Sequence, residues 1–204
     1  MNYLYILAGT GAVGAIGGGI YLAYPHSPTF RSKSIEDKLR QEYFVPITED
    51  SAWQTMLTKY NEKKNEARFT SEKVDVKLED LKSSCKKALS ENADTSENYK
   101  KSRRWCTIPK TLSSLLEAHK LNLLNTGDGS ENQQEWDKLQ KSYEKASENR
   151  IDGLDLGSDG DKWKKLREKC KEISQKDSTE ENFETLFSNL KRWCTKEESD
   201  KLTQ

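Results

Sequence analysis

The chain has 204 residues, of which 33% are charged and 33% apolar. Its 34 basic residues balance its 34 acidic ones, so no net field would draw it to nucleic acid, and we exclude nucleic acid as a partner. This small supply of apolar residues, spread over long solvated faces, favours thin helical bundles over an enzyme with a deep pocket.

The amino-terminal segment differs sharply from the rest, because the first 24 residues carry no charged side chain. The run 3–24 is long enough, at about 1.5 Å per helical residue, to span a hydrocarbon core of about 30 Å, and tyrosines lie near both of its ends. We therefore expect a transmembrane anchor over 1–24 that contacts membrane lipid through 3–24, followed by a tether over 25–47. The alternatives are a cleaved signal peptide, which would lack its usual basic start, and a buried glycine-rich hairpin.

The glycines of this segment allow two interpretations. Gly9-Thr-Gly11-Ala-Val-Gly14 matches the G-x-G-x-x-G fingerprint of dinucleotide-binding folds, but no second strand and no alternation of strands with helices follows it. We favour a helix-packing face that supports self-association, because small residues recur at four-residue spacing. The residues of this face are Gly11, Gly14, Ala15, Gly18 and Gly19.

An internal repeat organises the hydrophilic body. The stretch Arg103-Arg104-Trp105-Cys106-Thr107 recurs as Lys191-Arg192-Trp193-Cys194-Thr195, and Trp-Cys pairs two rare residues. Further matches precede each copy: Cys85 with Cys170, Leu81 with Leu166, Leu78 with Trp163, Trp53 with Trp136, Met56 with Leu139 and Tyr60 with Tyr143. We expect repeats over 48–107 and 131–195, a connecting helix and turn over 108–130, and a C-terminal tail over 196–204.

Both copies have the pattern of helices. Apolar residues follow i, i+3 or i+4, i+7 spacing, and no sustained alternation rich in Val, Ile and Tyr indicates a sheet. The expected fold is therefore all-α, with an N-terminal transmembrane helix followed by two tandem related helical-bundle repeats.

The four cysteines occupy equivalent sites in the two copies. Of three connectivities, the duplication favours Cys85–Cys106 and Cys170–Cys194, each closing a loop of about 20 residues and adding roughly 3 kcal/mol. Four free thiols in a reducing cytosol are the alternative. A metal site is not expected, because no C-x2-4-C spacing is present.

Other features that look chemical have simpler interpretations. The stretch 155–161 is similar to a calcium loop, but Trp163 and Leu166 occupy positions where that loop needs ligands, so we expect a polar turn. His119 on a leucine-rich helix is expected to be a half-buried face residue, and His26 lies in the tether. No catalytic motif is present, so we expect no enzyme activity and no cofactor.

The glycine-rich amino terminus, the Lys-rich helical body and the repeated element resemble the paralogous families of uncharacterised membrane-anchored proteins of hemotropic mycoplasmas. The motif stands here as Arg104-Trp105-Cys106 and again as Arg192-Trp193-Cys194, and the shared layout covers most of the chain. No catalytic residues come with this resemblance. It implies a wall-less parasite and an antigenic role at its host-facing surface.

Two functions remain open at this point. The first is a non-enzymatic single-pass membrane-anchored surface protein, an interaction or antigenic module whose partner is a host protein or an antibody. The second is a cytoplasmic-facing membrane-tethered helical scaffold with free thiols. Arg31, Lys33, Lys38 and Arg40 closely follow the span and favour a cytoplasmic body, whereas the paired cysteines favour the exterior, towards which we lean.

Overall fold

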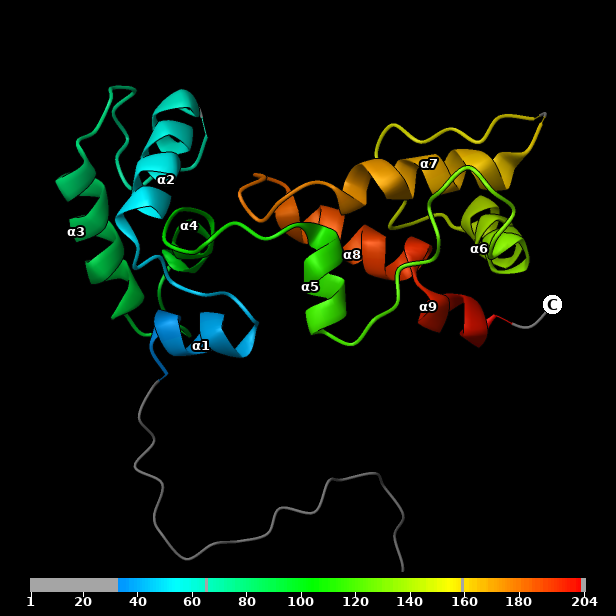
Figure 1. Ribbon diagram of the computed structural model, residues 1–204, viewed down its shortest axis with the longest axis horizontal. Helices are drawn as coiled ribbons and strands as arrows, with labels where there is room; N and C mark the ends of the chain where they lie inside the picture. The colour runs from blue at the N-terminus through cyan, green and yellow to red at the C-terminus, as the bar shows by residue number, and fades with distance from the viewer. Residues whose placement is uncertain (1–32, 65, 159, 203–204) are drawn as a thin grey trace, which may run out of the picture. The chain divides into compact units, whose positions relative to one another are not determined.

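In the computed structural model, residues 33–64, 66–158 and 160–202 are described, and every regular element of that part of the chain is a helix (Figure 1). The helices are α1 (Ile35–Gln41), α2 (Asp50–Glu62), α3 (Leu78–Leu89), α4 (Tyr99–Trp105), α5 (Leu112–Ala118), α6 (Gln133–Lys145), α7 (Lys162–Ser174), α8 (Phe183–Cys194) and α9 (Lys196–Lys201). The predicted all-α class is confirmed for these residues.

The expected membrane segment cannot be followed in this fold. Among the residues described, no helix has the length and apolar character needed to cross a membrane. The anchor over 1–24, its lipid-contacting run 3–24 and the helix-packing face of small residues all lie outside the described residues. That face comprises Gly11, Gly14, Ala15, Gly18 and Gly19.

The segment 25–47, for which we expected a tether, contains α1. A capping box starts this helix, since the Asp37 N–H donates to Ser34 Oγ at 3.1 Å and the Ser34 N–H donates to Asp37 Oδ2 at 3.2 Å. Ile35 and Leu39 are fully buried, so α1 packs into the body. Its partners are α3 and α4.

The connecting helix expected within 108–130 is α5, and it resembles α1 in detail. Thr111 caps it, with the Ser114 N–H donating to Thr111 Oγ1 at 3.3 Å. Both helices end in a left-handed residue, Tyr43 after α1 and Lys120 after α5, with φ of 67° and 59°. Like α1, α5 packs against two later helices, in this case α7 and α8.

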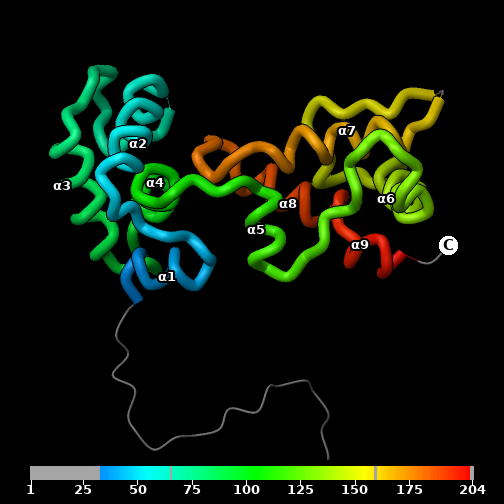
Figure 2. Tube along the Cα trace, in the orientation of Figure 1, coloured from blue at the N-terminus to red at the C-terminus, as the bar shows by residue number. Residues whose placement is uncertain are grey.

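We call 33–108, with α1 to α4, the first half and 109–202, with α5 to α9, the second half. An extended segment carries the chain from α4 to α5 (Figure 2). Isolated β-bridges occur at corresponding places: Ser34 with Asn92 and Pro46 with Thr107 in the first half, Thr111 with Asp177 and Leu123 with Thr195 in the second. Short extended segments therefore bind the helices of each half together in the same way.

Two buried clusters fill the body. The smaller lies in the first half and comprises Ile47, Trp53, Met56, Tyr60, Leu81, Cys85, Trp105 and Cys106. The larger fills the second half around Trp136, Leu166 and Trp193, and it also takes in residues of α1 such as Leu39. Because α1 contributes to the larger cluster, apolar packing continues from one half into the other.

Candidate interaction site

Both predicted disulfides are present. Cys85 bonds to Cys106 with their Cα atoms 5.4 Å apart, and Cys170 bonds to Cys194 with their Cα atoms 5.7 Å apart. Each bridge joins the third helix of a half to the end of its fourth, and all four cysteines are used.

The bridges lie in closely similar surroundings. In the second half, the Tyr143 and Trp193 rings meet edge to face with centroids 5.0 Å apart, and Trp193 Nε1 donates to the Asn149 carbonyl at 2.7 Å. In the first half, Tyr60 and Trp105 also meet edge to face with centroids 5.0 Å apart. Trp105 Nε1 donates to a loop carbonyl at 2.8 Å. Each tryptophan thus fixes a helix–helix loop of its own half to the disulfide.

Sequence reasoning missed one pair of residues in these surroundings. The guanidinium carbon of Arg68 lies 4.3 Å from the Tyr60 ring centroid, and that of Arg150 lies 4.4 Å from the Tyr143 ring centroid. Matching the two halves by equal spacing does not pair these arginines, because Arg68 follows Tyr60 by eight positions and Arg150 follows Tyr143 by seven.

The repeated basic pair is used differently in the two halves. Arg103 and Arg104 are each only 3% exposed, and they donate to the second half at 2.6 Å, Arg103 Nη1 to the Ser178 carbonyl and Arg104 Nε to the Thr179 carbonyl. Burial lowers the pKa of both guanidinium groups, which nevertheless stay charged. The corresponding Lys191 and Arg192 are exposed. The motif therefore fastens the first half to the second and leaves an exposed basic end on the second, where Lys191 lies over the Phe187 ring and Arg192 over the Trp193 ring.

A cavity of about 570 Å³ opens between α1, α2 and α3 in the first half. Its apolar wall includes Trp53 and Leu89, and charged side chains of α1 and α3 line it as well. The complete lining is Ser34, Glu36, Arg40, Pro46, Ile47, Thr48, Trp53, Lys82, Cys85, Lys86, Leu89 and Ser90.

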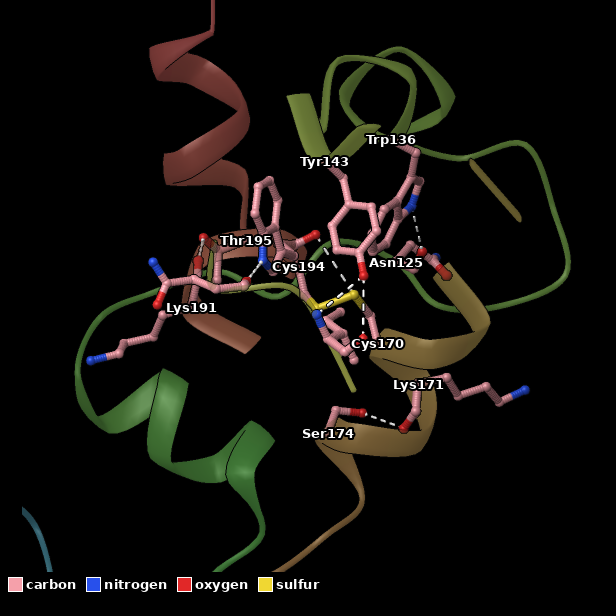
Figure 3. The surroundings of a disulfide bond; sticks show 12 residues. Asn125, Trp136, Tyr143, Cys170, Lys171, Ser174, Lys191, Cys194 and Thr195 are labelled. Carbon is pink, nitrogen blue, oxygen red and sulfur yellow. Dashed lines mark hydrogen bonds between the residues drawn. A yellow bond between two sulfur atoms is a disulfide. The ribbon is translucent and has the colours of Figure 1, made fainter. Parts of the chain in front are cut away.

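A loop of the chain itself, 125–131, lies at the corresponding place in the second half. The tryptophan there, Trp136, donates from Nε1 to the Asn125 carbonyl at 3.1 Å (Figure 3). Arg167, which corresponds to Lys82, donates from Nη1 to the Gly129 carbonyl at 2.6 Å. Trp136 is fully buried, whereas Trp53 keeps 8% of its surface exposed.

A difference in chain length lies behind this contrast. Trp53 comes six positions after Ile47, whereas Trp136 comes twelve positions after Leu124, so the second half has six more residues at this point. This insertion is visible in the sequence, but the place that it covers is not, since spacing alone does not tell where a loop folds.

The described part of the calcium-like stretch 155–161 and His119 lie in surroundings that indicate a structural role. The Gly157 N–H donates to Asp155 Oδ1 at 2.9 Å, which makes a tight polar turn of that part of the calcium-like stretch. Over the described residues, which leave out position 159, no group of His, Cys, Asp or Glu side chains could hold a metal ion. His119 lies between aromatic rings, 4.9 Å from that of Tyr43 and 5.6 Å from that of Phe187, and burial lowers its pKa.

No family model matches the sequence, and neither a curated protein nor a solved structure is significantly similar to it.

Proposed function

We propose that the chain is a non-enzymatic, single-pass membrane-anchored helical protein that displays a disulfide-stapled body on the cell surface as an interaction or antigenic module. The observation that carries this proposal is the pair of bridges Cys85–Cys106 and Cys170–Cys194, which uses every cysteine. Disulfides persist in oxidising surroundings and are rare where glutathione keeps thiols reduced. The uncharged run 3–24 supplies the anchor.

We further infer that the body consists of two copies of one four-helix repeat, α1 to α4 and α5 to α8. Three similarities between the halves support this inference. Each half has a disulfide beside a tyrosine–tryptophan pair, and each has isolated β-bridges at corresponding places. In addition, α1 and α5 have similar caps and both end in a left-handed residue. On this inference, α1 belongs to the first repeat and α5 to the second, and the copies extend beyond 48–107 and 131–195. The helix α9 follows as an addition to the second copy.

A host protein or an antibody is the class of partner that this placement implies. The body offers two surfaces to such a partner, the exposed basic end at Lys191 and Arg192 and the cavity beside Trp53. Both belong to parts of the chain that a disulfide holds rigid, and a rigid surface loses less entropy on binding.

Surface shaving tests the proposal. Intact cells that express the full chain are treated with trypsin, and the body is followed with an antibody against its C-terminal residues. We expect the body to be cleaved on intact cells while a cytosolic protein of the same cells stays whole. Protection of the body until the cells are lysed would contradict the proposal.

The rival function, a cytoplasmic scaffold with free thiols, is favoured by Arg31, Lys33, Lys38 and Arg40, which follow the span closely. Mass analysis after alkylation separates the two. Chain isolated under acid quench should take up no alkylating groups before reduction and four after it. Uptake of four groups without reduction would establish the rival and refute the surface assignment.

A further inference from the structure

We propose that the cavity of the first half binds an acidic, glycine-containing peptide turn presented by another protein. This inference rests on the proposed function, because it treats the two halves as copies of one repeat. The second half has such a turn built into its own chain, whereas the first half has the corresponding place open.

The first argument is what fills the equivalent place in the second half. The 125–131 loop has the sequence Asn-Thr-Gly-Asp-Gly-Ser-Glu, and its carbonyls accept hydrogen bonds from Trp136 and Arg167. A tryptophan of one helix and a cation of the next thus bind a peptide backbone. The first half has a tryptophan and a lysine at the corresponding positions, Trp53 and Lys82.

The second argument is that these two donors are available. The indole N–H of Trp53 donates to no partner among the described residues, and its nitrogen is accessible to solvent. Lys82 Nζ lies 2.9 Å from Asp50 Oδ1, but the Asp50 side chain is 88% exposed. Such an exposed ion pair contributes little, so Lys82 can exchange Asp50 for a ligand group at small cost.

The third argument is charge. The cavity lining contains Arg40, Lys82 and Lys86 against a single carboxylate, that of Glu36, which pairs with Arg40 at 2.7 Å. Lys86 forms no salt bridge with any described residue. An acidic turn complements this lining, and the loop in the second half is itself acidic through Asp128 and Glu131.

The fourth argument is size and shape. A volume of about 570 Å³ is that of a small-ligand site, which suits one turn of peptide better than a helix or a folded domain. The apolar wall formed by Ile47, Trp53 and Leu89 would cover the backbone of a turn rich in glycine, which can approach a tryptophan closely.

Binding is measured on the purified full chain in detergent micelles, with tryptophan indole nitrogens labelled for NMR. The probe is a cyclic peptide that contains Asn-Thr-Gly-Asp-Gly-Ser-Glu. The chain has five tryptophans, and Trp53→Phe identifies the Trp53 signal. We expect the peptide to shift the Trp53 indole signal and leave that of Trp136 in place. An unmoved Trp53 signal at millimolar peptide would overturn the proposal.

Matched variants locate the site. Lys86→Glu should weaken peptide binding about tenfold, since it places a like charge against the ligand. Lys87→Glu makes the same charge change one residue away, outside the cavity lining, and should leave binding unchanged. Equal loss in both variants would show attraction to the general charge of α3 and would contradict a site. A neutral peptide, with Asn and Gln in place of Asp and Glu, should bind the unsubstituted chain about as weakly as the acidic peptide binds the Lys86→Glu variant.

A graft gives an independent readout. Copying residues 126–131 between Thr48 and Glu49 should fill the first cavity, move the Trp53 signal without added peptide and abolish peptide binding. Full peptide binding by the grafted chain would refute the site, and the lysine variants decide the matter if the graft does not fold. Because binding is measured on purified protein, its failure would leave surface display standing, and failure of the shaving test would leave the site standing.

Discussion

The guanidinium of Arg103 lies over the ring of Phe183, with its central carbon 3.9 Å from the ring centroid. Arg103→Ala would remove this contact and leave the buried Ser178 carbonyl without its donor, so we expect a loss of about 2 kcal/mol in the free energy of unfolding. Urea unfolding of the full chain in micelles measures it. Lys191→Ala, at the corresponding exposed position, is the control; it removes only an exposed contact with the Phe187 ring and should change the free energy by less than about 1 kcal/mol.

Each disulfide can be removed separately. The paired change Cys85→Ala and Cys106→Ala opens a loop of 21 residues and should cost about 3 kcal/mol, since the unfolded chain regains its freedom. The matching change at Cys170 and Cys194 opens a loop of 24 residues and should cost nearly the same. Thermal unfolding with and without reductant gives both values. If reductant does not destabilise the unsubstituted chain, the stabilising role of the bridges is refuted.

Asp177 makes the contact between the halves sensitive to acid. Although burial opposes it, hydrogen bonds from Lys59 and Thr179 hold the pKa of this carboxyl below its ordinary value of 3.8. A carboxyl with a depressed pKa stabilises the folded state above its unfolded pKa, and that stability is lost as the pH falls through its folded pKa. The advantage of the unsubstituted chain over Asp177→Asn should therefore be full at pH 6 and shrink below about pH 4.

Urea unfolding of both chains between pH 6 and pH 2 measures this difference. The exposed Asp50→Asn serves as the control for removing a carboxylate that pairs with a lysine within the first half. A difference between the unsubstituted chain and Asp177→Asn that stays constant over the whole range would contradict the assignment.

Lys120 ends α5 in the left-handed region, with a φ of 59°. Glycine adopts this conformation without the steric cost that a side chain brings, so Lys120→Gly should stabilise the protein by about 0.5–1 kcal/mol. The control is Lys141→Gly inside α6, which should destabilise it by about 1 kcal/mol. Melting temperatures of the two variants should move in opposite directions, and a decrease in both would contradict the capping role of Lys120.

The helical class and the favoured cysteine pairing could be predicted from the sequence, and the reason is physical. Long amphipathic helices repeat their apolar residues over several turns, and the Trp-Cys element marks equivalent positions by two rare residues. The seven-residue helices α1 and α5 give much weaker signals. Ile35 and Leu39 are the buried apolar residues of α1, and such a short pattern does not distinguish a helix from a tether.

The candidate site was less accessible to sequence reasoning. Trp53 and Lys82 line a cavity because α2 and α3 pack side by side and because no loop covers the two residues. The periodicity of the sequence predicts neither the packing of these helices nor the open place beside them. The burial of Arg103 could not be foreseen either, because its counterpart Lys191 is exposed in the same motif. Whether such a surface is covered depends on what the chain places next to it.

Both bridges join cysteines that are close in sequence, 21 and 24 residues apart, and neither bridge spans the two halves. On the proposed surface placement the chain is exported from its amino terminus, so Cys106 would be the first partner that Cys85 meets, and that pair can oxidise before Cys170 emerges. Cys170 and Cys194 then remain as the last two thiols. The order of the cysteines along the chain thus directs oxidation to the native pairs, and a cell with little disulfide isomerase could still complete this protein.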